Sequence, residues 1–153
     1  MLKVEDVMVD KVVTIDASKN ARDAVNLMNK HEIGCLVVTM KSKPVGIVTE
    51  RDFLKRILAK SKNPEAVKIR EIMSAPLRTA EPDMDVEDVT KFMFRMNIKK
   101  LPVIQGRKLV GLVTFTDLVR FQPQIVKILK KISELGPPPR PKRMKKVIDY
   151  YVA

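Results

Sequence analysis

Cysteine, histidine and tryptophan are almost absent from this chain of 153 residues. It contains one cysteine, Cys35, one histidine, His31, and no tryptophan. A single cysteine excludes an internal disulfide framework, which fits a reducing cytoplasm better than an oxidising compartment. One cysteine and one histidine also fall short of the ligand sets that structural zinc sites use. Because Cys35 stands within an apolar run, we interpret it first as a small core residue and not as a nucleophile.

Long apolar runs and catalytic motifs are also missing. No uninterrupted apolar stretch approaches the roughly 18 residues of a transmembrane helix, and acidic residues stand near the N-terminus where a signal peptide needs an apolar run. The sequence has no phosphate-binding lysine loop, no serine-nucleophile elbow and no dinucleotide-binding glycine pattern. We therefore expect a cytoplasmic binding module that requires no cofactor, and not an enzyme.

Acidic residues are too few to balance the basic ones. The chain has 30 Lys and Arg against 18 Asp and Glu, a formal net charge of +12. An excess of this size favours anionic partners such as nucleotides, nucleic acids or phosphates. Half of it lies in the last 33 residues, 121–153, which hold 8 basic and 2 acidic residues.

Three interpretations of the segment 122–153 fit its pattern. Residues 123–135 have the apolar stripe of an amphipathic helix, ended by Gly136, and this helix would cap the rest of the chain or join a dimer. The basic run that follows would bind RNA or DNA phosphates, with Tyr150 and Tyr151 stacking on bases. A membrane-surface role is the weakest interpretation, because the run is short and poorly amphipathic.

The rest of the chain contains one unit twice. "GIVTERD" begins at residue 46, and "GLVTFTD" follows it 65 residues later. At this offset, residues 6–56 align with 71–121 without a gap, and 13 of the 51 pairs are identical. This indicates an internal duplication. We divide the chain into a first repeat (1–60), a connector (61–70), a second repeat (71–121) and a C-terminal segment (122–153).

Each copy predicts the order strand, helix, strand, strand, helix, which defines an α/β fold of the α+β kind. The first copy has runs rich in β-branched residues that predict strands over 11–15, 35–40 and 44–49. The apolar character of these runs indicates a sheet covered on both faces. In the second copy, 101–114 predicts a hairpin whose turn uses a positive φ at Gly106.

Helical periodicity predicts the two helices of each copy. Asp16 or Ser18 is the expected N-cap of the first helix, and the second helix covers 50–60. Four apolar residues of this second helix should face a core: Phe53, Leu54, Ile57 and Leu58.

The repeated motif places three chemically useful residues where a strand ends and a helix begins. Gly46 permits a close backbone approach, Thr49 offers a hydroxyl, and the carboxylate of Asp52 suits the two donors of a ribose diol. The same residue types also cap helices. Their presence at corresponding places in both copies favours binding.

The first copy contains "VVTID", "ARDAVNLM", "IGCLVV" and "PVGIVTERD", and the second contains "LRTAEPDMDVEDVTKFM", "IKKLPVI" and "LVGLVTFTD". On these motifs, both copies resemble the CBS domain, named after cystathionine β-synthase. The tandem pair, from residue 1 to about 121, resembles a Bateman module. This resemblance implies two repeats packed through a pseudo-twofold, with clefts between them. It further implies an adenosine-containing regulatory ligand (AMP, ADP, ATP or S-adenosylmethionine) and favours a homodimer. The missing motifs and the single cysteine and histidine, for their part, predict no catalytic or metal-binding residues.

The resemblance also implies roles for matching residues. The motif aspartates would accept from ribose hydroxyls, the motif threonines would contact the ribose or α-phosphate, the first-strand residues would border the base, and the basic residues would reach phosphates. The remaining candidates mark positions where the copies differ. The expected ligand-binding residues are Thr14, Ile15, Cys35, Thr49, Arg51, Asp52, Thr79, Ala80, Lys99, Lys100, Pro102, Thr114, Thr116 and Asp117.

The two sites should be chemically unequal. Lys99 and Lys100 stand where the first copy has Gly34 and Cys35. We therefore expect the site that contains Asp117 to bind phosphate more strongly.

These observations predict a module that senses an adenine nucleotide and passes that state to a partner macromolecule. Two alternatives stay open. One is a nucleic-acid-binding protein that uses the basic C-terminal segment, and the other is a structural dimer whose sites are empty.

Overall fold

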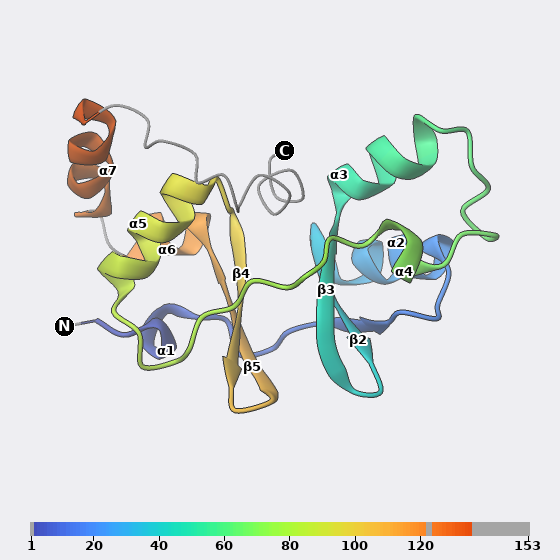
Figure 1. Ribbon diagram of the computed structural model, residues 1–153, viewed down its shortest axis with the longest axis horizontal. Coiled ribbons are helices and arrows are strands. Elements are labelled where there is room, and N and C mark those ends of the chain that lie inside the picture. Colours follow the sequence, from blue (N-terminus) through green and yellow to red (C-terminus); the bar gives the residue numbers. More distant parts are fainter. Residues whose placement is uncertain (1, 122–123, 136–153) are drawn as a thin grey trace. The chain divides into compact units, whose positions relative to one another are not determined.

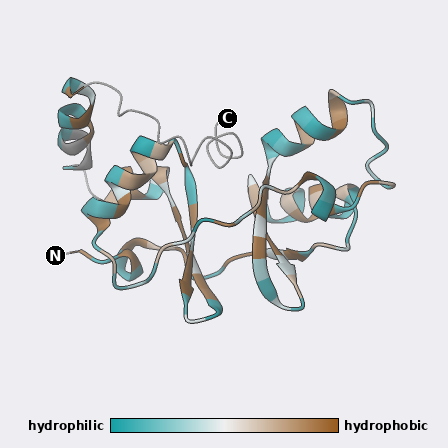
Figure 2. Ribbon diagram, viewed as in Figure 1, coloured by the Kyte–Doolittle hydropathy of each residue, from teal (hydrophilic) through white to brown (hydrophobic). Residues whose placement is uncertain are grey.

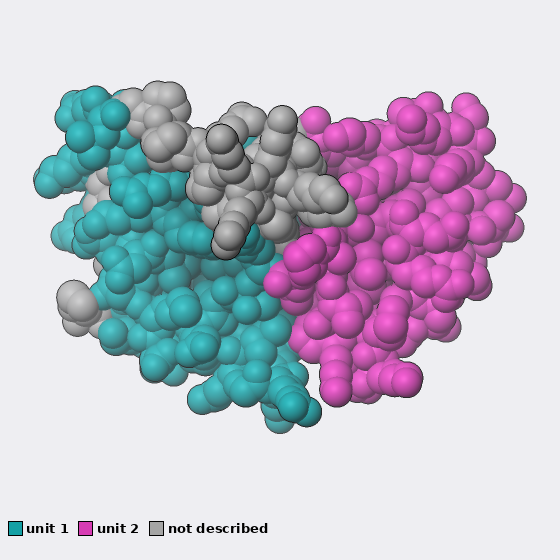
Figure 3. Space-filling view, viewed as in Figure 1, with its two compact units in different colours: residues 1–11, 78–152 teal, residues 12–77, 153 magenta. Residues whose placement is uncertain are grey.

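The protein, here a computed structural model that describes residues 2–121 and 124–135, forms two compact units (Figures 1 and 3). Among the described residues, unit 1 combines 2–11 with 78–121 and 124–135, and unit 2 contains Val12–Leu77. The units therefore do not coincide with the copies in the sequence. The residues that open the first copy pack with the second copy, and the connector packs with the first.

Unit 2 contains a sheet of three strands in the order β1–β2–β3. β1 is parallel to β2, and β2 is antiparallel to β3. Ser74 forms an antiparallel bridge with Ile47 and so extends the β3 edge. The elements are β1 (Thr14–Asp16), α2 (Ala21–His31), β2 (Cys35–Met40), β3 (Lys43–Thr49), α3 (Glu50–Phe53), the π-helix η1 (Leu54–Leu58) and α4 (Ile69–Ile72).

Unit 1 is built around the hairpin of β4 and β5, which are antiparallel. Ala80 takes the place of a first strand with a single parallel bridge to Val103, and Val9 bridges to Leu112 on the other side. The elements are α1 (Val4–Val7), α5 (Val86–Met96), β4 (Lys100–Gln105), β5 (Lys108–Thr114), α6 (Phe115–Phe121) and α7 (Ile125–Glu134).

Each unit has its own apolar core. In unit 2, α2 and the sheet bury Ala24, Leu36 and Val48 with the residues around them. In unit 1, α5 and the hairpin bury Met93, Leu101 and related residues. Figure 2 shows the turns of both hairpins as hydrophilic ends of largely apolar strands. The predicted α/β fold with two repeats of helices and strands is therefore confirmed, with the first strand of the second copy reduced to one bridge.

Two local predictions in the first copy were wrong. The first strand covers Thr14–Asp16 and not 11–15. The N-cap of α2 is Asn20, whose side chain accepts from the backbone N of Asp23. Asp16 instead accepts from the backbone and hydroxyl of Ser18, so these two residues form a local turn before the helix.

Of the four residues predicted to form the core face of the helix over 50–60, two face the core and two are exposed. Ile57 is buried and Phe53 packs against the core of unit 2. Leu54 and Leu58, however, are 59% and 72% exposed. The helix continues from α3 into a π-helix, and its wider turn moves side chains away from the 3.6-residue stripe that the sequence pattern assumes.

The C-terminal helix forms within the predicted range, as Ile125–Glu134, and packs against α5 and α6. Ile132 is buried and Leu129 packs against the core of unit 1, as the stripe predicted. Leu135, assigned to the same stripe, is 82% exposed. Gly106 has the expected positive φ of 64°. The predicted helix end at Gly136 and the basic run after it lie outside the described residues.

Candidate functional site

Unit 1 contains every candidate residue of the second copy. Phe115 N donates to Lys99 O, and Lys100 lies opposite Thr114 in the β4–β5 register. On the other side of β4, Ala80 N donates to Pro102 O. The start of β4 therefore lies between the motif at the end of β5 and the short segment at Ala80.

The motif threonine and aspartate of unit 1 contact each other. Thr114 Oγ1 donates to Asp117 Oδ2 at 2.7 Å, and Asp117 N donates to Thr114 Oγ1 at 3.1 Å. The spacing of three residues across a strand end and a first helical turn produces this pair. Asp117 is partly exposed, and Thr116 beside it is exposed.

A cavity of about 430 Å³ lies next to Thr79 and Ala80. Its walls include the apolar side chains of Val89, Phe92 and Leu101. Ala80 is buried, and its N and O already bond to Pro102 O and Ile104 N. Exposed Thr79 is therefore the predicted base-bordering residue with the better access to a ligand.

Asp85 also lines this cavity and was not predicted. It is the N-cap of α5, and its Oδ1 accepts from Glu87 N at 2.8 Å. Its other carboxylate oxygen, Oδ2, is buried and has no hydrogen-bond partner among the described residues. Only its place before an apolar helical stripe could have indicated the residue in the sequence, and that signal points to capping.

Unit 2 contains every candidate residue of the first copy. Thr14 and buried Ile15 lie on β1, paired with the middle of β2. Cys35 is buried at the start of β2 and pairs with Thr49 at the end of β3. Arg51 is exposed in the first turn of α3. The interpretation of Cys35 as a core residue agrees with this placement.

Asp52 has surroundings that differ from those of Asp117. It is only 6% exposed, and its Oδ2 accepts from Thr49 N at 2.8 Å and from Thr49 Oγ1 at 3.4 Å. Arg56 Nε lies 3.8 Å from Oδ1. Burial raises the pKa of the Asp52 carboxyl above its ordinary value, against the lowering effects of the Thr49 backbone bond, the Arg56 charge and the side chains of Thr49 and Ser74.

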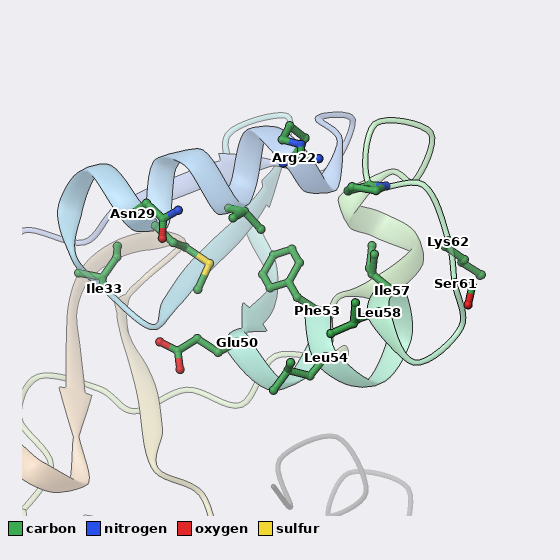
Figure 4. A pocket seen from close by; sticks show the side chains of 13 residues that line it. Arg22, Asn29, Ile33, Glu50, Phe53, Leu54, Ile57, Leu58, Ser61 and Lys62 are labelled. Carbon is green, nitrogen blue, oxygen red and sulfur yellow. The ribbon is translucent and has the colours of Figure 1, made fainter.

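A larger cavity in unit 2, of about 620 Å³, is lined by none of the expected ligand-binding residues. α2 forms one side of it, and α3 with η1 forms another (Figure 4). Phe53 projects into the space below α2, and exposed Leu54 and Leu58 lie along its edge. The cavity marks an apolar groove between helices and not the motif at the strand end.

Among residues 2–121 and 124–135, no cluster of His, Cys, Asp and Glu is arranged to hold a metal ion. In the same part of the chain, every helix is too short or too polar to cross a bilayer.

The family model "CBS domain" matches residues 4–59 and 69–124. The chain belongs to the CBS-domain family and carries two tandem CBS repeats, in a class of proteins that are generally regulatory. The earlier resemblance is therefore confirmed, and its residue-by-residue roles stay predictions.

A curated relative agrees with this assignment. Protein MK0525 of Methanopyrus kandleri is 36% identical over 122 residues, which are 78% of this chain and 62% of that protein. This chain thus spans about three-fifths of that relative.

Two solved structures are also similar. The CBS domain pair of protein MJ0100, in complex with 5-methylthioadenosine and S-adenosyl-L-methionine, has a TM-score of 0.71 at 32% identity and covers 79% of this chain and 95% of that chain. A hexameric CBS-CP12 protein from bloom-forming cyanobacteria has a TM-score of 0.72 at 33% identity and covers 82% and 74%.

Proposed function

We propose that this protein is a non-enzymatic sensor of an adenosine-containing nucleotide, whose binding changes the arrangement of its two repeats and is transmitted to a partner. The observation that carries the proposal is the combination, within unit 1, of an apolar cavity with a strand end that carries a hydroxyl, a carboxylate and two lysines. The solved relative MJ0100 holds two adenosine derivatives in its CBS pair, which supports this ligand class.

The cavity beside Thr79 suits a purine base. Its volume of about 430 Å³ falls in the roughly 300–1,000 Å³ range of small-molecule sites. Phe92, Val89 and Leu101 offer apolar surface for the faces of the ring. Asp85 lines the same cavity, and its carboxylate is an acceptor of the kind that suits the exocyclic amino group of adenine.

The end of β5, which lies on the other side of β4 from Ala80, suits the rest of a nucleotide. The carboxylate of Asp117 accepts hydrogen bonds, as a ribose diol requires, and the hydroxyl of Thr114 lies beside it. Lys100, opposite Thr114, and Lys99 before it supply positive charge for phosphates. A ligand changes the arrangement of repeats only through its different affinities for the alternative arrangements, so the transmitted signal depends on which arrangement it favours.

A thermal-unfolding panel tests the proposal. The protein is heated alone and with AMP, ADP, ATP, S-adenosylmethionine or a short single-stranded RNA. A ligand at 100 times its dissociation constant should add about 2.7 kcal/mol to the native state. Inosine monophosphate is the matched control, because its base has a carbonyl where adenine has the amino group. We expect at least one adenosine ligand to raise the melting temperature and inosine monophosphate to raise it less.

Two results of the panel would contradict the proposal. Stabilisation by RNA alone would favour the alternative of a nucleic-acid-binding protein that uses the basic C-terminal segment. Stabilisation by none of these compounds would favour the structural dimer with empty sites.

We further propose that the protein is a homodimer in the cytoplasm and that the groove of unit 2 lies in the contact between copies. The corresponding helical face of unit 1 is covered by α7, which packs on α5 and α6. In unit 2, Leu54 and Leu58 remain 59% and 72% exposed beside the groove. Water-exposed apolar side chains that adjoin a groove are typical of a protein interface. A solved relative is hexameric, which supports assembly in this family.

Light scattering after size-exclusion chromatography measures the oligomeric state directly. We expect a mass of twice 17.4 kDa for the wild type and 17.4 kDa for Leu54→Glu/Leu58→Glu, because two carboxylates would be buried in an apolar contact. Leu135→Glu, a change at an 82% exposed leucine outside the groove, should leave the dimer intact. A monomeric wild type, or a Leu54→Glu/Leu58→Glu protein of unchanged mass, would refute the assignment.

A further inference from the structure

The motif carboxylate of unit 2 is held by several donors from other parts of the fold. Asp52 accepts from the backbone N and the hydroxyl of Thr49, both through Oδ2. The side chain of Ser74 also donates to the carboxylate, and Arg56 Nε lies 3.8 Å from Oδ1. With only 6% of the residue exposed, these contacts replace water.

Arg56 is itself fixed. Its Nη1 donates to the backbone oxygen of Ile72 at 2.7 Å and to that of Met73 at 3.1 Å. Ser74 follows directly and is bonded to Ile47 through both backbone groups. Asp52 therefore joins the helix α3 to the segment 72–74, which is 20 or more residues away in the sequence.

The corresponding aspartate of unit 1 lacks these two side-chain donors. At the offset of 65 residues, Phe121 stands in the place of Arg56 and Val9 in the place of Ser74. Neither side chain can donate a hydrogen bond. Asp117 is partly exposed, and the hydrogen bond recorded for its carboxylate comes from Thr114 in the same turn.

The two carboxylates thus differ in what a ribose diol would have to displace. At Asp52 the ligand would compete with a backbone donor, a hydroxyl and a cation in a buried place, and it would leave those donors unsatisfied. At Asp117 it would compete with one neighbouring hydroxyl, which can turn to accept from the ligand instead.

We infer that each chain binds one nucleotide through the ribose contact of Asp117, and that Asp52 is a structural carboxylate held by Arg56 and Ser74. This inference rests on the proposed function. It differs from the sequence-based expectation of two unequal sites, because it removes the ribose contact of the first copy altogether and assigns the cause to residues outside the repeated motif.

Isothermal titration calorimetry on the full chain tests the inference with the panel ligand that gives the largest thermal shift. We expect one ligand per chain. Asp117→Asn should weaken binding about 10- to 100-fold, as expected when a hydrogen bond to a charged group is lost. Asp52→Asn, the same substitution at the corresponding position, should change the affinity less than about 2-fold and lower the melting temperature.

The outcomes separate this inference from the proposed function. Two ligands per wild-type chain, or an equal loss of affinity in a natively folded Asp52→Asn, would overturn the inference and leave the sensor function standing. Should Asp52→Asn not fold, the stoichiometry of the wild type and the affinity of Asp117→Asn decide the matter without it. An absence of binding by all four adenosine ligands would overturn the proposed function itself.

Discussion

Leu36→Ala should lower the free energy of unfolding by about 2–5 kcal/mol. Leu36 lies in β2, the central strand of the unit 2 sheet, and its side chain is 0% exposed. Removing three carbon atoms there loses both the transfer free energy and the contacts of the surrounding side chains, since the strands on both sides limit collapse of the cavity. Chemical denaturation followed by circular dichroism measures the loss, and the melting temperature should fall by several degrees.

Leu135→Ala provides the control for this measurement. The residue type and the number of deleted atoms are the same, but Leu135 is 82% exposed and the change should stay within about 0.5 kcal/mol. A Leu36→Ala protein that is as stable as Leu135→Ala would show that β2 does not lie at the centre of a packed core.

Gly46→Ala should cost about 1–3 kcal/mol, the usual range for overpacking. A Cβ at this position would lie 2.9 Å from both the backbone oxygen of Ser74 and the sulfur of Met73. The oxygen cannot retreat freely, because it accepts from Ile47 N at 3.1 Å in the bridge that extends the sheet. We expect the substitution to loosen the segment 72–74, and denaturation curves would report the loss.

Gly111→Ala is the matched comparison in the second copy. There the nearest atom to an added Cβ is the sulfur of Met8, at the end of a flexible side chain, and Val9 O is 3.1 Å away. A thioether can change its rotamer more cheaply than a backbone oxygen can move. Gly46→Ala should therefore be the more destabilising of the two, and the reverse order would show that the Ser74 bridge yields easily.

The short-range part of the candidate site was predictable from the sequence. Thr114 and Asp117 are three residues apart at a strand end, so their contact follows from local geometry, and Thr49 and Asp52 repeat it. The pairing of each strand hairpin was predictable for a similar reason, because short connections favour antiparallel neighbours.

The long-range part was not predictable. Nothing in the pattern around Arg56 indicates that its guanidinium meets the backbone of Ile72 and Met73, since such a contact depends on how α3 packs against a distant segment. The exposure of Leu54 and Leu58 was missed because periodicity assumes a regular α-helix, whereas this helix widens into a π-turn. The empty acceptor on Asp85 depends equally on packing, because only burial makes an unbonded oxygen costly.

By itself, the sequence determined that this protein contains two copies of one α/β unit, each with a threonine and an aspartate in the same turn, and that its charge favours anionic ligands. Those features depend on residue identity and on spacings of a few positions. Only the tertiary structure decided that residues 2–11 complete the unit of the second copy, and that Asp52 is enclosed while Asp117 stays accessible. The physical reason is that burial and hydrogen-bond partners are set by segments that meet in space, and the same motif acquires different chemistry when Arg56 and Ser74 in one copy are replaced by Phe121 and Val9 in the other.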